Sequence, residues 1–295
     1  LRKSCLDSTA VLKAIQVEQG ILVERVRDAY AFSHLTLQEY LTAKYICDWQ
    51  LIDELVPHLI DRSWKEVFLL TSGLLRPNAD KLLLQMEEEA QKYINTPKLK
   101  ALVKWAERET TGSPGDIKPV AKRAIAIANA NANANANANA NANANANANT
   151  YAIANANAIA KAYANAIAYG IANAYANAYA IEQVINTTRN LEKLQIFNNL
   201  NSTNLIGQLQ ELKAAIPDDN QSPDVKRKFA DKLLQTLLKG FNLNLEMVSL
   251  SREELEAWNN YLYANYLILQ CKQAAVIVSP QTWAEIEDRM LRLSD

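Results

Sequence analysis

The sequence has too little of several ingredients that most enzymes need. Its seven glycines form none of the GxxxxGK[ST] or GxGxxG loops that bind phosphates, and no GxSxG turn that carries a nucleophile. The two histidines, His34 and His58, have no cysteine or carboxylate at metal-ligand spacing. No cysteine lies near a candidate base. We therefore expect no catalytic residues, no metal and no cofactor in this chain, which is not predicted to be an enzyme.

Strong charge, paired cysteines and long apolar runs are also missing. The formal net charge is −1, so bulk electrostatics predict neither a nucleic-acid partner nor binding to an anionic membrane. Cys5, Cys47 and Cys271 form no CxxC pair and no even disulfide framework, which is typical of a reducing cytosol. No apolar run has the length of a membrane span, and no signal pattern is present. The predicted location is the cytoplasm.

Leucine-rich periodic segments between short loops predict a mostly α-helical protein. Ser8 can cap a first helix over 8–19, and Gly20 suits the left-handed position that ends many helices. The segment 21–34 is rich in β-branched and aromatic residues and has a turn candidate at 27–28. This composition predicts a short two-stranded hairpin.

A capping-box pattern follows the hairpin. Thr36 and Glu39 have the Thr-x-x-Glu spacing that begins many helices, and the predicted helix covers about 37–49. Its apolar stripe is formed by Leu37, Tyr40, Leu41 and Tyr45. Helix, hairpin and helix in this order are typical of the end of a winged-helix domain.

Further helix starts are predicted before position 111. Ser63 and Glu66 form a second capping box. Asn78 can cap the next helix, and Thr96 can cap another with Pro97 at its first position. The loop "TTGSPGD" that follows gives the clearest domain boundary.

The C-terminal part is helical again. Gly240 is predicted to end one helix, and Ser251 with Glu254 forms a capping box for a long one. The segments 243–250 and 274–278 are interpreted as short extended connectors. Three tryptophans on apolar stripes are expected in the core, namely Trp64, Trp258 and Trp283.

These patterns divide the chain into five parts. They are the C-terminal part of a winged-helix domain (1–50), a short helical domain (51–111), a linker (112–123), an Ala-X low-complexity tract (124–181) and a C-terminal helical domain (182–295).

The Ala-X tract has alanine at every even position from 124 to 180 except Thr150 and Gly170. A single strand of that length would measure roughly 190 Å at about 3.3 Å per residue, so helix is favoured over strand. In its second half, Ile and Tyr recur every four residues from Ile159 to Tyr179, and helix is predicted for 151–198. The stretch 126–149 has no apolar stripe, and its order is left open.

The tract is interpreted as a tolerated expansion of a two-residue repeat inside a helical segment. An interaction surface or an assembly spacer is the functional alternative. An amyloid-like asparagine ladder is a further, less favoured one.

One stretch is specific. "YAFSHLTLQEYLTAKYI" (30–46) resembles the F-x-H-x-T-x-Q-E-Y/F-x-x-A motif of NACHT-type nucleotide switches, which belong to the STAND class of signalling NTPases. "WKEVFLLTSGLL" (64–75) is similar to the helix that follows that motif. The segment 260–291 resembles the C-terminal helical domain of cyanobacterial NACHT proteins. Of these three segments, only 30–46 carries a specific motif.

The resemblance implies a regulatory or sensor region of a nucleotide-switch ATPase in bacterial antiviral defence or signalling. It implies an upstream NACHT ATPase domain in cis, homo-oligomerisation on activation and a trigger ligand or protein of unknown identity. ADP or ATP is implied for the intact protein.

His34 is the one candidate site residue. A lone histidine is more often packed or serves a helix N-terminus. Given the motif, the resemblance implies that His34 contacts the β-phosphate of ADP in the intact protein, where backbone N–H groups at a helix start can also meet an anion. Gln38 and Glu39 are expected to be capping and interface residues.

The chain begins at Leu1 rather than methionine, within a predicted helix, so we expect it to be part of a longer protein. The alternative is a free-standing α-helical scaffold that binds a protein partner and has no nucleotide link. A Walker A motif encoded upstream of Leu1 favours the first reading, and a start codon near Leu1 favours the second.

Overall fold

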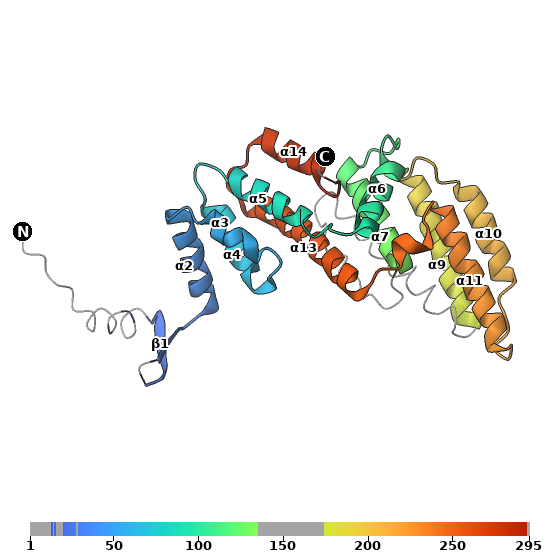
Figure 1. Cartoon of the computed structure of the whole chain (residues 1–295), viewed down its shortest axis with the longest axis horizontal. Coiled ribbons are helices and arrows are strands. Elements are labelled where there is room, and N and C mark those ends of the chain that lie inside the picture. Colours follow the sequence, from blue (N-terminus) through green and yellow to red (C-terminus); the bar gives the residue numbers. More distant parts are fainter. Residues whose placement is uncertain (1–12, 14, 16–19, 28, 135–173, 294–295) are drawn as a thin grey trace, which may run out of the picture. The chain divides into compact units, whose positions relative to one another are not determined.

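The computed structural model describes residues 13, 15, 20–27, 29–134 and 174–293 (Figure 1). The helix predicted over 8–19 falls almost wholly outside the described residues. The described chain is mostly helical with one two-stranded sheet, which confirms the predicted fold class. It divides into two compact units, which are described separately. Unit 1 comprises 1–85 and 270–279, and unit 2 comprises 86–269 and 280–295.

The predicted hairpin is confirmed in unit 1. Strand β1 (Leu22–Val26) pairs antiparallel with β2 (Ala29–Phe32). Leu22 lies opposite Phe32, and the register shifts between Glu24 and Val26. Gly20, just before β1, has a φ of 62°, the left-handed conformation expected at that position.

Helix α2 (Leu35–Asp48) follows and packs against α4 (Lys65–Leu74). The helix α3 (Ile52–Leu55) and the 3-10 turns η2 (Val56–His58) and η3 (Arg62–Trp64) connect them. Gly73 of α4 is closely approached, since a Cβ there would lie 3.2 Å from the carbonyl oxygen of Ala274. A larger residue at this position would push the two backbones apart.

Both capping boxes predicted in unit 1 are wrong. Helix α2 begins at Leu35 with His34 as N-cap and no side-chain cap, so Thr36 lies inside the first turn, where its hydroxyl cannot cap the helix start. Before α4, the carboxylate of Asp61 accepts a hydrogen bond from the Ser63 N–H at 2.9 Å. The chain enters α4 through the 3-10 turn η3, which moves the cap to Asp61.

Helix α5 (Asp80–Gln91) and helix α13 (Arg252–Ala274) each contribute residues to both units. As predicted, the Asn78 side chain accepts a hydrogen bond from the first N–H of α5, that of Asp80, at 3.2 Å. The predicted box before α13 is also confirmed. The Ser251 N–H donates to Glu254 at 2.8 Å, and the Glu254 N–H donates to the Ser251 hydroxyl at 3.2 Å.

Unit 2 is built from helices. They are α6 (Pro97–Thr110), α7 (Pro119–Ala134), α9 (Ala174–Lys193), α10 (Ser202–Ala214), α11 (Pro223–Gly240), α12 (Leu245–Val248), most of α13, and α14 (Pro280–Arg289). Helix α6 packs on α7, and α10 packs on both α9 and α11. Thr96 caps α6, as predicted, by accepting a hydrogen bond from the Leu99 N–H at 3.3 Å.

Two segments of unit 2 differ from the sequence prediction. Helix α7 begins at Pro119, inside the predicted linker 112–123, because proline suits the first helical position and the helix then buries Lys122 and Arg123. The predicted connector 243–250 contains helix α12, which the Asn244 side chain caps.

The core of unit 2 contains a cluster of aromatic side chains, formed by Trp105, Phe197 and Phe241. Trp105 is 1% exposed, and its indole N–H donates to the carbonyl oxygen of Phe241 at 2.9 Å. The rings of Phe197 and Phe241 lie 5.6 Å apart. Trp258 is buried as predicted, whereas Trp64 and Trp283 are only partly buried.

Both described ends of the Ala-X tract are helical. Residues 124–134 belong to α7, and residues 174–180 belong to α9. Asn129 in α7 is fully buried. The predictions for 135–173, including the order of most of 126–149, fall outside the described residues.

Candidate functional site

The predicted site residue, His34, lies at the start of α2 in unit 1. Its backbone is extended, with φ −132° and ψ 135°, and its side chain makes no capping hydrogen bond. The side chain is exposed. The carbonyl oxygen of His34 accepts the Leu37 N–H at 3.1 Å, which is the first turn of the helix. The imidazole is therefore free to contact a group outside the described fold.

The surroundings of His34 favour an anion. The first N–H groups of a helix have no carbonyl partner within that helix, and the helix dipole places partial positive charge there. The first turn of α2 contains no acidic residue that would repel an anion. Next to His34, the Ser33 hydroxyl is buried and has no hydrogen-bond partner among the described residues. An exposed histidine side chain and the first amides of a helix thus occur together at this end.

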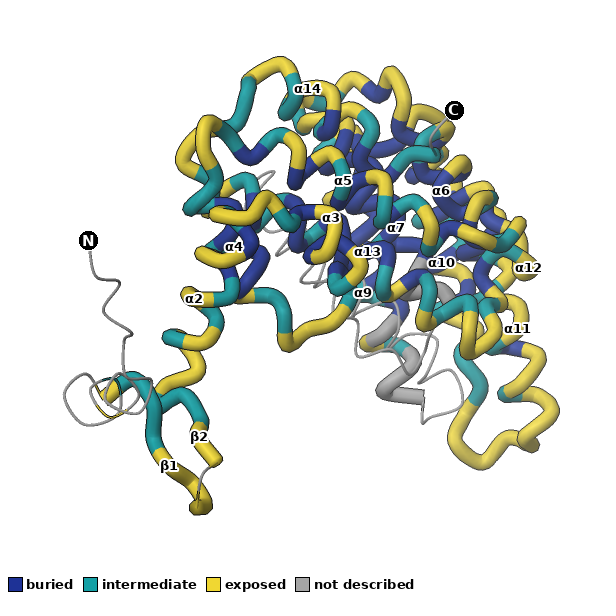
Figure 2. Tube along the Cα trace, turned by 60° about the vertical axis from the view of Figure 1, so that its left-hand side comes forward, coloured by how far each residue is buried: buried dark blue, intermediate teal, exposed yellow. Residues whose placement is uncertain are grey.

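The other motif residues divide between the core and the surface. Ala43 is fully buried where α2 packs on α4, and Ile46 is 6% exposed. Gln38 and Tyr40 are exposed, and Glu39 is partly exposed. Figure 2 shows the hairpin and most of α2 as intermediate or exposed. The motif therefore contributes little to the core of unit 1, which leaves much of it available for contacts outside the described residues.

One face of α2 carries exposed apolar side chains. Leu41, Tyr45 and Trp49 are 42%, 57% and 67% exposed, at a spacing of four residues that aligns them on a helix. The rings of Tyr45 and Trp49 lie 6.0 Å apart. A row of this size on a helix is typical of a surface that meets another protein domain.

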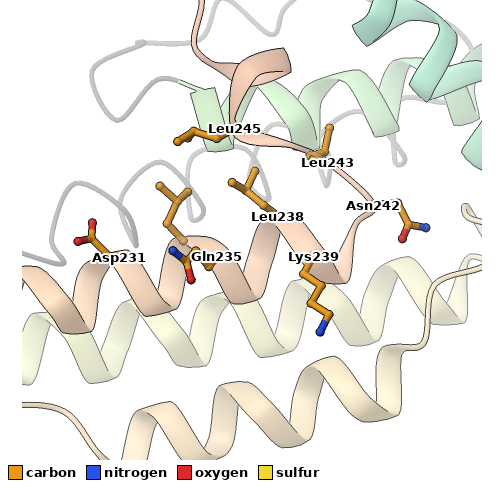
Figure 3. A pocket seen from close by; sticks show the side chains of 8 residues that line it. Asp231, Gln235, Leu238, Lys239, Asn242, Leu243 and Leu245 are labelled. Carbon is orange, nitrogen blue, oxygen red and sulfur yellow. The ribbon is translucent and has the colours of Figure 1, made fainter.

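A second candidate is a pocket of about 530 Å³ in unit 2 (Figure 3). It lies along α11 and the segment that leads to α12. Leucines from both line it, with Asp231, Gln235, Lys239 and Asn242 as polar residues. No histidine or cysteine lines it, and its only charged lining residues are Asp231 and Lys239. It resembles a shallow binding groove more than a reaction site.

Two other reactive side chains, Cys271 and His58, pack against neighbouring residues. Burial raises the pKa of the Cys271 thiol to about 12, so this cysteine is an inert core residue. The ring of His58 stacks on Trp64 with centroids 4.0 Å apart. Within the described residues, no group of three or more His, Cys, Asp and Glu side chains could hold a metal ion. None of the helices described has the length and hydropathy needed to cross a membrane.

Comparison with known proteins identifies two domains. Residues 6–46 match the family model of the winged helix-turn-helix domain C-terminal to NACHT, and residues 205–293 match that of NACHT C-terminal helical domain 2. No curated protein and no solved structure matches the chain. Both matched domains are of types that follow a NACHT domain. The chain contains a C-terminal portion of a NACHT protein, with His34 inside the matched winged-helix segment.

Sequence reasoning missed the polar contacts that hold α14, the last helix. They involve Arg123, Glu87 and Glu107, which come from three different helices. Each looks like an ordinary surface charge in the sequence, and only the packing of α5, α6 and α7 brings them to α14. No local sequence signal could have identified them.

Proposed function

We propose that this chain is the regulatory C-terminal region of a NACHT nucleotide-switch ATPase and that His34 contacts a phosphate of bound ADP in the intact protein. The observation that carries this proposal is the exposed side chain of His34, the N-cap residue of α2, which makes no capping hydrogen bond. The matched winged-helix and helical domains support it, because both are domains that follow a NACHT domain.

In this mechanism His34 favours the ADP-bound state. The imidazole donates a hydrogen bond to a phosphate oxygen, and the N-terminal amides of α2 add their partial positive charge. Loss of ADP removes these contacts, and the winged-helix segment is then free to move. The exposed face of α2 formed by Leu41, Tyr45 and Trp49 is a suitable surface for the upstream ATPase domain.

The wider role follows the resemblance. The intact protein is proposed to be a cytoplasmic bacterial protein of the cyanobacterial type that responds to a trigger, forms a homo-oligomer and acts in defence or signalling. This chain on its own is proposed neither to bind ATP tightly nor to hydrolyse it. Turnover by the purified chain would overturn that part of the proposal.

The test uses the intact protein with His34→Ala, and His58→Ala serves as a matched control. His58 stacks on Trp64 and has no place in the proposed phosphate contact. The ADP that copurifies is released by denaturation and quantified by chromatography. We expect His34→Ala to retain less ADP or to be active without trigger, whereas His58→Ala retains ADP. Normal ADP content and basal activity in His34→Ala would refute the assignment.

A further inference from the structure

Helix α14 and the turn after it make several ionic contacts with the rest of unit 2. Arg289 forms a two-pronged pair with Glu87 of α5, with N–O distances of 2.9 and 2.8 Å. Just beyond the helix, Arg292 pairs with Glu107 of α6 at 2.7 Å. Within the last turn of the helix, the carboxylate of Glu287 accepts hydrogen bonds from the Lys118 amine, just before α7, at 2.8 and 3.0 Å. Three neighbouring elements thus each contribute an ionic contact.

A buried arginine completes the attachment. Arg123 of α7 is 4% exposed. Its guanidinium donates to the carbonyl oxygens of Asp288 at 2.7 Å, Met290 at 3.0 Å and Glu287 at 3.4 Å. These are the carbonyls at the C-terminal end of α14, which lack partners within the helix and carry partial negative charge. Burial lowers the pKa of Arg123, but an arginine side chain keeps its charge in proteins.

The polar contacts extend along α5 and α13. Gln91 lies one helical turn after Glu87 on α5, and its side-chain amide donates to the carbonyl oxygen of Arg292 at 3.1 Å. The Tyr261 hydroxyl of α13 lies 3.5 Å from the same oxygen. The turn that follows α14 therefore also contacts side chains of α5 and α13.

The segment also buries three apolar side chains. Ile286, Met290 and Leu291 are buried, while most of the other side chains of α14 are exposed or partly exposed. A helix with few buried apolar side chains belongs to the less stable elements of a fold, which open before the rest. Its attachment therefore depends on these three side chains together with the polar contacts, of which those of the buried Arg123 are the most enclosed.

We propose that α14 is a charge-latched strap, formed by residues 280–292, that detaches from unit 2 as one element. Its detachment removes every hydrogen-bond acceptor that Arg123 contacts. A buried charge without partners is strongly destabilising, so the first turns of α7 open together with the strap. Because the Ala-X tract begins at Ala124 in α7, docking of the strap anchors the start of that tract.

The test is hydrogen exchange of the 295-residue chain, followed by mass spectrometry, with Arg123→Gln. We expect exchange to rise at least about tenfold in peptides from 280–292 and from the start of α7, with α10 and α11 unchanged. Arg189→Gln is the matched control, because Arg189 contacts only Asn186 of its own helix in a hydrogen bond. Unchanged exchange in 280–292 would refute the proposal, as would an equal rise throughout unit 2.

A charge exchange keeps the test decisive if Arg123→Gln fails to fold. Glu87→Arg places two arginines together and is expected to release the strap. Adding Arg289→Glu restores an opposite pair at the same place and is expected to restore at least half of the lost protection in 280–292. No recovery in the double variant would show that the charges do not hold the strap and would overturn the proposal.

Discussion

Trp105 provides the sharpest stability prediction, because its ring and its N–H group can be removed separately. The side chain is 1% exposed in the core of unit 2. Trp105→Ala leaves a large cavity and is expected to lower the free energy of unfolding by about 3–5 kcal/mol. Trp105→Phe keeps most of the volume but loses the hydrogen bond to the Phe241 carbonyl. We expect about 1–3 kcal/mol for that change.

The measurement is urea unfolding followed by far-UV circular dichroism, with hydrogen exchange to assign the transition to unit 2. The order of stability should be wild type, then Trp105→Phe, then Trp105→Ala. The reasoning is refuted if Trp105→Ala costs less than about 1 kcal/mol, since a fully buried tryptophan cannot be removed so cheaply from a packed core.

Two glycines and one capping glutamate give further predictions. Gly115→Ala should destabilise unit 2 in urea unfolding, because a Cβ there would collide with the Leu194 carbonyl oxygen. Gly207→Ala should stabilise α10 by about 0.5–1 kcal/mol, because a Cβ at Gly207 would meet nothing within 4 Å. The opposite order of stability would contradict the packing. The hydrogen bond from the Ser251 N–H lowers the pKa of Glu254, so its stabilisation is present above the unfolded-state pKa near 4.3 and is lost as the pH falls through the lower folded-state pKa. The stability gap between wild type and Glu254→Gln, measured by urea unfolding against pH, should therefore narrow below about pH 4, and a gap independent of pH would argue against this cap.

Local signals predicted the elements well where the helix start has a suitable side chain. Thr96, Asn78 and the Ser251–Glu254 pair cap helices as their spacing indicates. The pattern at Thr36 failed because the same residue types also occur inside a helix, and Thr36 is the second residue of α2. Only the extended backbone of His34 fixes where α2 begins.

Long-range contacts were beyond sequence reasoning. Trp105 was not singled out, although it is among the largest fully buried side chains described, because its partner Phe241 is far away in sequence. The start of helix α7 inside the predicted linker 112–123 was missed for a similar reason. Its first turns are stabilised by tertiary contacts of Lys122 and Arg123, and a polar pair next to a loop looks solvated in a sequence.

The candidate site residue, His34, was predicted from its motif and not from its chemistry. In the sequence alone, His34 has no local feature that distinguishes it from a surface histidine. Its assignment therefore depends on the flanking residues of the "FSHLTLQEY" motif. The fold adds that the side chain is exposed at a helix start without an acidic residue in the first turn.

The most direct test of the central claim is the affinity of the intact protein for ADP, measured for wild type, His34→Ala and His58→Ala. A hydrogen bond to a charged group contributes about 1.5–3 kcal/mol, so we expect the affinity for ADP to fall by roughly ten- to a hundredfold. His58→Ala should bind ADP as the wild type does. Equal ADP affinity in all three proteins would contradict the account.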